Sequence, residues 1–387
     1  MKINFLARAL LSIIFGMGLL CIGFYGFLMA VFSVSQRFYV PFVLIVTGVF
    51  IVLVVLGGLR LVNPRILTII LVSFLVICTV TVTGYETAQH YYKSLPTVNE
   101  QGVDLNEYKP FTTGTKAVRL GGPASLKIRT GLPTIDGATA LYPLYSAFAQ
   151  AVYPQGEYNV DRSEVMCNNT IGAYDNLIDG KTDIIFTARP SSEQLESAQK
   201  RGIELKLTPI GREAFVFFVN AKNQVKELSV SQIQDIYSGK ITNWQEVGGN
   251  YEKIRAFQRP ENSGSQTMLQ KLMEGKTLMR PPKEDIATGM GEIIEETAGY
   301  RNYKNAIGYS FLFFATEMIR NNQIHLLKVN GVYPERNFIQ SKKYPLVAEF
   351  YAVTAGSKNP NIKALIEWIL SPEGQYLVEK TGYTPIK

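Results

Sequence analysis

Three long apolar stretches near the N-terminus constrain this chain more than any other feature of its sequence. They cover about residues 9–34, 40–59 and 66–84, and none of them contains a charged side chain. A helix that crosses a bilayer needs about 20 apolar residues, so each stretch is long enough. A cleaved signal peptide has one apolar segment of about 7–15 residues, and three successive uncharged core helices are not expected in a soluble protein. We therefore predict three transmembrane helices.

Charge indicates how these helices are oriented. The chain has 39 Lys and Arg against 32 Asp and Glu, but residues 1–85 contain five basic residues and no acidic one. With the N-terminus in the cytoplasm, only Arg37 lies in an outer loop, which fits the positive-inside rule. We predict a multi-pass plasma-membrane protein with a cytoplasmic N-terminus and an extracellular C-terminal domain. The cytoplasmic basic residues would be Lys2, Arg8, Arg60 and Arg65.

Beyond residue 85 the basic and acidic residues are nearly balanced, so the net charge of +7 does not indicate nucleic-acid binding. The Gly-Leu-Leu-Cys sequence that ends at Cys21 matches a lipid-attachment signal poorly, and two further spans follow it. His90 and His325 lie far apart, no Cys-x-x-Cys occurs, and Cys167 is alone in the C-terminal part. We predict no catalytic residue, no metal site, no cofactor and no enzyme activity.

The composition divides the chain into three parts. Residues 1–85 form the membrane region, and residues 86–114 are polar, contain Pro96 and Pro110, and are predicted to be a linker. A short helix continuing from the third span is compatible with the start of this linker. From about residue 115 onward, short apolar runs alternate with helical periodicity, which predicts an α/β domain over residues 115–387.

The predicted strands of this domain are 126–129, 183–187, 205–209, 214–219, 254–257, 306–309 and 349–354. The predicted helices are 141–151, 171–178, 192–201, 230–237, 265–272, 286–296, 313–320 and 362–380.

Small polar residues precede three of the predicted helices. The first loop is Asp136-Gly-Ala-Thr, the second is Asn168-Asn-Thr-Ile-Gly, and the third is Arg259-Pro-Glu-Asn-Ser-Gly-Ser. The first N–H groups of a helix have no intrahelical acceptor and carry about half a positive charge, so they bind anions. Any one such loop is more often only a capped helix start. Together, three starts and Arg259 would supply roughly +2.5 charges, against about −1.5 to −2 on phosphate.

Six segments in this order resemble the phosphate-binding proteins of bacterial phosphate ABC transporters, which are type II periplasmic binding proteins. The resemblance covers residues 115–387 and none of the membrane spans. The segments are residues 136–139, 177–189, 236–244 (Ile-Tyr-Ser-Gly-Lys-Ile-Thr-Asn-Trp), 259–265, 306–310 and 373–385.

This resemblance implies an α/β domain of two lobes that close on an oxyanion. Lobe 1 would contain about residues 115–213 and 350–387, and lobe 2 about residues 214–349. Paired crossover strands near residues 214–219 and 346–354 would form the hinge. The implied ligand-binding residues are Ala138, Thr139, Ala140, Asn169, Thr170, Arg259, Ser263, Gly264 and Ser265.

One departure from the family affects the expected selectivity. Many members have an Asp at the position of Arg189, where it accepts a proton from phosphate. Arginine cannot accept a hydrogen bond, so selectivity for phosphate over sulfate would need another carboxylate. Asp136, Glu213 and Glu261 are the alternatives, and Arg189 is also a candidate second guanidinium in the site.

The predicted function is a membrane-anchored extracellular solute-binding protein that captures phosphate or a similar oxyanion by lobe closure, for ABC-type uptake or for sensing. Its expected partners are the anion, the lipid bilayer and an ABC permease or membrane sensor. The alternative is a signalling or scaffolding membrane protein whose outer domain contacts a protein partner without binding an anion. Three spans are more than a tether requires, and Gly16, Gly18, Gly23 and Gly26 would allow close helix contact.

Overall fold

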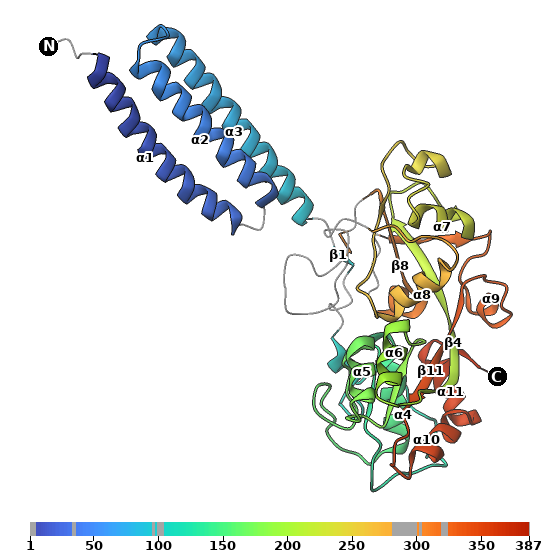
Figure 1. Cartoon of the computed structure of the whole chain (residues 1–387). Helices are drawn as coiled ribbons and strands as arrows, with labels where there is room; N and C mark the ends of the chain where they lie inside the picture. The colour runs from blue at the N-terminus through green and yellow to red at the C-terminus, as the bar shows by residue number, and fades with distance from the viewer. Residues whose placement is uncertain are drawn as a thin grey trace. The chain divides into compact units, whose positions relative to one another are not determined.

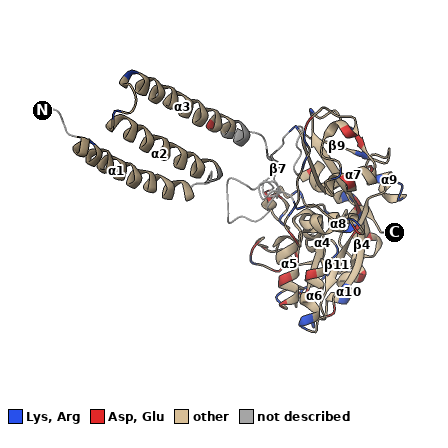
Figure 2. Ribbon diagram, turned by 45° about the horizontal axis from the view of Figure 1, so that its top comes forward, with Lys and Arg blue, Asp and Glu red and all other residues tan. Residues whose placement is uncertain are grey.

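The computed structural model describes residues 5–32, 36–94, 97–98, 104–280, 300–301, 304–318 and 324–386. The chain forms two compact units, Met1–Tyr92 and Lys93–Lys387 (Figure 1). Charge distinguishes the two units. The helices of the first unit carry charged residues only near their ends, whereas both signs of charge are spread over the second (Figure 2). The domain bounds proposed from the sequence stay predictions.

The first unit contains three long helices, α1 (Phe5–Val31), α2 (Gln36–Gly58) and α3 (Pro64–Ser94). Each is long and apolar enough to cross a membrane, which agrees with the three predicted spans. Helix α3 continues past the predicted end of the third span at residue 84, so the segment proposed as a linker begins as helix.

Glycine brings α1 and α2 into close contact. A Cβ on Gly23 would lie 2.4 Å from Thr47 Cγ2, and a Cβ on Gly58 would lie 1.9 Å from Ser12 Oγ. Gly26 also faces α2, whereas no atom lies within 4 Å of a Cβ on Gly16 or Gly18. Two of the four glycines that we considered for contact with a partner are therefore used within the chain itself.

The second unit is built on an eight-stranded mixed sheet. Along its main path the strands are β2 (Ile135–Gly137), β3 (Ile184–Thr187), β11 (Val347–Thr354), β4 (Lys206–Asn220), β8 (Ala306–Phe311) and β6 (Arg255–Ala256). Strands β12 (Thr384–Pro385) and β9 (Ile324–Leu326) also pair with β4. The pairs β2–β3 and β6–β8 are parallel, whereas β4 is antiparallel to all of its partners.

Two short sheets lie apart from this one. Strand β1 (Thr97–Val98) pairs with β7 (Tyr300–Arg301), and β5 (Glu227–Leu228) pairs with β10 (Lys328–Val329).

Two hydrophobic cores define two lobes. The core of lobe 1 contains Tyr145, Phe148 and Trp368, and is formed by α4 (Tyr142–Val152), α10 (Ile362–Ile369) and α11 (Pro372–Thr381) with β2 and β3. The core of lobe 2 contains Phe217, Trp244 and Tyr309, and is formed with α7 (Val230–Tyr237) and α8 (Gly264–Leu272). Helices α5 (Asn169–Ile178) and α6 (Ser192–Lys200) belong to lobe 1, and α9 (Arg336–Gln340) packs on lobe 2.

Strand β4 connects the two lobes. Its residues 206–214 pair with β11, and its residues 215–220 pair with β8 and β9 (Figure 1). The sequence predicted two strands here, at 205–209 and 214–219, but β4 pairs with β11 across the residues between them. A Cβ at Gly211 would lie 2.3 Å from Phe350 Cζ of β11, so a larger residue would have to displace the Phe350 ring.

Other elements differ from the prediction. Residues 126–129 are not a strand, although the N–H of Ile128 donates to the carbonyl of Val152. The predicted helix 362–380 is two helices, because Pro372 starts α11 and Ser371 caps it. The predicted helix 313–320 contains a short π-helix, Phe314–Met318. The predicted helix 286–296 lies outside the described residues.

Part of the segment proposed as a linker packs on lobe 1. A 3-10 helix, Leu105–Tyr108, buries Tyr108 in the core of this lobe. The N–H of Phe111 donates to Gln150 Oε1 of α4 at 2.9 Å.

Candidate anion-binding site

The first loop of the site begins where β2 ends. Gly137 is required there, because a Cβ would lie 2.5 Å from the carbonyl oxygen of Phe186 on β3. The N–H of Ala138 donates to that same carbonyl at 2.9 Å. A 3-10 turn, Thr139–Leu141, then leads into α4, and the N–H of Leu141 donates to the carbonyl of Ala138. The N–H groups of Thr139 and Ala140 precede the first intrahelical bond, so the helix offers them no acceptor.

A buried carboxylate joins the first loop to the second. Asp136 is fully buried, and its Oδ1 accepts from the N–H groups of Gly137 at 2.7 Å and Asn168 at 2.8 Å. Its Oδ2 accepts from Asn168 Nδ2 at 2.8 Å and from Asn176 Nδ2 at 2.9 Å. Four donors offset the cost of burying this charge and fix the two loops relative to each other.

The second loop opens α5. Asn169 has a left-handed φ of +54°, and its Oδ1 accepts from the N–H of Ile171 at 2.9 Å and of Gly172 at 3.3 Å. The oxygen of Asn169 therefore caps its own helix. The next residue, Thr170, is buried at the start of the helix.

The third loop opens α8 in lobe 2. Ser263 is the N-cap of α8, and its Oγ accepts from the N–H of Gln266 at 3.3 Å. The first intrahelical bond runs from the N–H of Thr267 to the carbonyl of Ser263. The N–H groups of Gly264 and Ser265 therefore have no acceptor within the helix.

Arg259 is held at the start of the third loop by buried polar groups. Its N–H donates to Gln266 Oε1 at 3.0 Å and to the Tyr309 hydroxyl at 2.9 Å. Gln266 Nε2 donates in turn to Gln258 Oε1 at 3.2 Å. Only 5% of Arg259 is exposed.

The three loops meet at one cavity. Its volume is about 610 Å³, including space open to solvent. The lining residues of loops 1 and 2 are Ala138, Thr139, Ala140, Asn169, Thr170 and Ile171. The lining residues of lobe 2 are Arg259, Pro260, Ser263, Gly264, Ser265, Ser310 and Phe311, and Phe314 follows β8. The site therefore lies between the lobes and joins three helix starts with one guanidinium.

The charge of this lining is suited to an anion. Among the residues that the structure describes, Arg259 is the only charged lining residue, and no Asp or Glu lines the cavity. Hydroxyl groups of Thr139, Thr170, Ser263, Ser265 and Ser310 add neutral donors. The helix dipoles add partial positive charge at the same place.

Nine of the ten predicted ligand-binding residues line the cavity, and Arg189 does not. Arg189 is exposed, its Nη2 donates to the Tyr351 hydroxyl at 2.9 Å, and its guanidinium lies 5.4 Å from the centre of the Tyr351 ring. It follows β3, and Tyr351 lies on the adjacent strand β11, so a cross-strand contact holds it away from the cavity. The described structure does not place a second guanidinium in the site.

None of the three alternative acceptors lines the cavity in the described structure. All four donors to Asp136 are protein groups. Glu213 is buried in β4 and accepts from the N–H of Phe313, and burial raises its pKa to about 8. Glu261 is exposed and accepts from Gln270 Nε2 at 2.5 Å.

The sequence did not identify five of the lining residues, Ile171, Pro260, Ser310, Phe311 and Phe314. Ser310 ends the 306–310 segment that supported the family resemblance, so that segment was the available signal. Ile171 and Pro260 lie within the second and third loops but were not chosen as ligand-binding residues, because they are apolar. Phe311 and Phe314 lie outside all three loops.

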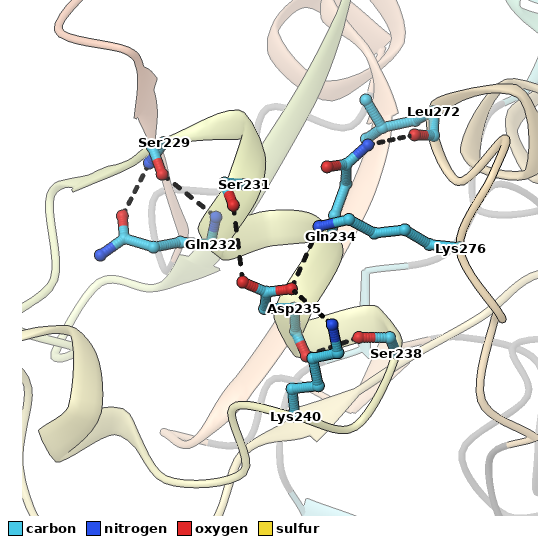
Figure 3. Close-up of polar contacts among 9 residues, drawn as sticks. All are labelled: Ser229, Ser231, Gln232, Gln234, Asp235, Ser238, Lys240, Leu272 and Lys276. Atoms are coloured by element: carbon cyan, nitrogen blue, oxygen red, sulfur yellow. Dashed lines mark hydrogen bonds and ion pairs between the residues drawn. The ribbon is translucent and has the colours of Figure 1, made fainter.

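Helix α7 contacts the C-terminal end of α8, next to the segment 236–244 that supported the family resemblance. Gln234 Nε2 of α7 donates to the carbonyl of Leu272, the last residue of α8, at 2.7 Å (Figure 3). Asp235 pairs with Lys276 at 3.1 Å and with Lys240 at 3.9 Å (Figure 3). Trp244 is buried, and its Nε1 donates to the carbonyl of Asn305 at 2.8 Å. The contacts of Gln234 and Asp235 therefore hold α7 against the end of α8, the helix whose first turn lines the cavity.

Known proteins share this architecture and sequence. A model of the PBP superfamily domain matches residues 127–373. The phosphate-binding protein PstS of Bacillus subtilis is 27% identical over 263 residues, which cover 66% of this chain and 81% of that protein. PstS of Borreliella burgdorferi is 28% identical over 234 residues, which cover 57% and 81%.

A solved structure is similar as well. A Clostridium perfringens protein, assigned to phosphate ABC transporters as their substrate-binding protein, has been crystallised with bound phosphate. It matches with a TM-score of 0.50 and 26% identity, over 65% of this chain and 98% of that chain.

Proposed function

This chain belongs to the PBP superfamily, and from that premise we propose that it captures inorganic phosphate or a similar oxyanion between its two lobes. The three apolar helices would anchor it in the plasma membrane, with the binding domain outside and the N-terminus inside. Capture would serve ABC-type uptake or sensing.

The observation that carries this proposal is the convergence of three helix starts and Arg259 on one cavity. The proposed ligand-binding residues are Ala138, Thr139, Ala140, Asn169, Thr170, Arg259, Ser263, Gly264 and Ser265. N–H groups and hydroxyls stabilise a dianion without a fully charged pocket. A buried guanidinium adds the strongest single hydrogen bonds because it is charged and forked.

Calorimetry of the full chain in lipid nanodiscs tests this proposal. We expect phosphate to bind saturably at one site. Arg259→Ala should weaken binding at least about tenfold, because it removes a charge-assisted pair of hydrogen bonds. Arg259→Lys should be intermediate, because lysine keeps the charge and loses the fork.

Arg189→Ala is the matched control, because Arg189 contacts Tyr351 and does not line the cavity. We expect its affinity to stay within about twofold of wild type. If Arg259→Ala titrates like wild type, the role proposed for this arginine is wrong. If wild type gives no heat with phosphate, sulfate or molybdate, the scaffolding alternative replaces anion capture.

A further inference from the structure

A side chain next to the third loop bridges the two lobes. Asn262 directly precedes the helix cap Ser263 in lobe 2, and it contacts the first turn of α6 in lobe 1. Ser191 Oγ donates to Asn262 Oδ1 at 2.7 Å, and Asn262 Nδ2 donates to Glu193 Oε2 at 2.6 Å. Gln194 Nε2 donates to the carbonyl oxygen of Asn262 at 3.3 Å.

The local backbone constrains Asn262 and two of its three partners, Ser191 and Gln194. Asn262 has a left-handed φ of +66°, a conformation that asparagine tolerates better than most residues. Ser191 and Gln194 form a capping box, in which each side chain accepts from the backbone N–H of the other. Ser191 and Gln194 are also buried. Asn262 therefore meets groups that are already oriented, which lowers the entropy cost of the contact.

The bridge lies where the lobes touch. A Cβ on Gly264, two residues after Asn262, would lie 3.2 Å from Thr170 Oγ1 and 3.3 Å from Ala188 Cβ of lobe 1. None of Ser191, Glu193, Gln194 and Asn262 is among the residues that line the cavity. The contact is therefore suited to hold the lobes together without touching the anion.

We propose that Asn262 is a positioning residue whose contacts with Ser191, Glu193 and Gln194 form a latch that keeps the lobes closed and slows release of the bound anion. The effect on release rests on the function proposed above. The effect on the opening of the lobes does not rest on that function, because the four residues bond to one another and not to the anion.

Asn262→Gly removes the side chain and keeps the left-handed backbone. Loss of a charge-assisted hydrogen bond should speed the release of radiolabelled phosphate from the full chain in nanodiscs about tenfold, with association within about twofold. Asn330→Gly is the matched control, because Asn330 also has a left-handed φ, of +50°, and its Oδ1 accepts from the N–H of Val230 within lobe 2. We expect it to release phosphate like wild type.

A double-mutant cycle tests the pairing itself. Asn262→Asp places a carboxylate against Glu193 and should speed release further. Adding Glu193→Gln places an amide donor opposite the new carboxylate and restores a hydrogen bond. The double variant should therefore release phosphate several-fold more slowly than the sum of the two single effects predicts. Additive effects would argue against a direct contact.

Spin labels on cysteines replacing Lys200 of α6 and Lys271 of α8 report lobe opening without any ligand, with Cys21 and Cys78 changed to serine. We expect the ligand-free Asn262→Gly distance distribution to shift to longer distances than that of wild type. An unchanged distribution overturns the latch whether or not phosphate binds. A shifted distribution together with no phosphate binding by wild type would support the latch and overturn anion capture.

Discussion

A single carboxylate, Asp136, determines the geometry of two binding loops. It is buried, and it holds the backbone of Gly137 and both donors of Asn168. From the sequence it was one possible acceptor for a protonated phosphate. Its oxygens are instead satisfied by the protein, so its role in the structure is to position the loops.

The residues that line the cavity also determine the expected selectivity between phosphate and sulfate. Phosphate near neutral pH keeps a proton that sulfate lacks, and a site with a dedicated carboxylate acceptor rejects sulfate because that acceptor would be left unpaired. No Asp or Glu lines the cavity among the described residues, and Ser and Thr hydroxyls donate or accept equally well. We expect sulfate to bind within about tenfold of phosphate. Competition calorimetry at pH 8 measures this ratio, and a sulfate affinity more than about a hundredfold weaker would contradict it.

Glu213 makes stability depend on pH. Burial raises its pKa to about 8, against about 4.3 in an unfolded chain. Between these values the folded state holds a proton that the unfolded state has released. The free energy of unfolding therefore falls as the pH rises through this window.

Glu213→Gln is a neutral isostere that still accepts from the N–H of Phe313. We expect it to raise the melting temperature at pH 8 by about 3–8 °C and to change it little at pH 4.5. Thermal unfolding across this pH range measures the difference, and an equal shift at both ends would contradict the assignment.

Most residues that line the candidate cavity could be chosen from the sequence, and the exceptions have a physical cause. Loop residues such as Thr139 and Ser263 are marked by small polar residues ahead of a helix. Arg189 was assigned by its position in a family pattern, but its side chain bonds to Tyr351 on a neighbouring strand. Phe311 and Phe314 reach the cavity only through the tertiary fold. Spacing along the sequence predicts neither the Arg189–Tyr351 contact nor the position of these two phenylalanines.

Among the elements, strand β4 matters most, because it belongs to both lobes. The sequence predicted two strands, since Arg212 and Glu213 interrupt the apolar pattern. The pairing with β11 continues across these polar residues, so hydrogen bonding and not hydrophobicity sets the length of the strand. The break between α10 and α11 was missed because the apolar positions continue past Pro372. Proline can start a helix but cannot continue one, so a new helix begins there.

Helix α8 must approach lobe 1 closely, and Gly264 permits this. A Cβ there would be 3.2 Å from Thr170 Oγ1 and 3.3 Å from Ala188 Cβ, which is tighter than ordinary contact. We expect Gly264→Ala to hinder closure and to weaken phosphate binding about three- to tenfold, with little change in melting temperature. Calorimetry and thermal unfolding of the same preparation separate the effect on binding from the effect on stability.

The control for this variant must leave the backbone unstrained. Gly275→Ala is not a matched control, because the φ of Gly275 is +79°. Lys271→Ala is more suitable, because Lys271 is an exposed residue of the same helix and does not line the cavity.

At the scale of the whole molecule, the three apolar helices and the α/β unit were predictable, because length, hydrophobicity and periodicity determine them. The predicted orientation in the membrane rests on the positions of five basic residues. The packing of α1 on α2 through Gly23 and Gly58 was not predictable in register, because many glycines in these helices are equivalent in sequence.

Membrane-impermeant maleimide tests the orientation in cells, in a background with Cys21 and Cys78 changed to serine. Lys363→Cys should react in intact cells, because the side chain of Lys363 is 86% exposed in the α/β unit, which we propose to be extracellular. Arg60→Cys should react only after permeabilisation. Cys167 should react little in either case, because burial raises its pKa to about 11. The opposite pattern would place the domain in the cytoplasm.

The order in which the lobes are made follows from their cores. Among the described residues, the buried core of lobe 2 comes from one stretch, 214–344, whereas that of lobe 1 combines Tyr108 and Phe148 with Trp368 and Tyr383, which follow that stretch. During synthesis on the ribosome, the residues of the lobe 2 core are therefore all present before the core of lobe 1 can be completed. The apolar surface of lobe 1 that is made first therefore stays uncovered until residues 350–383 have been synthesised.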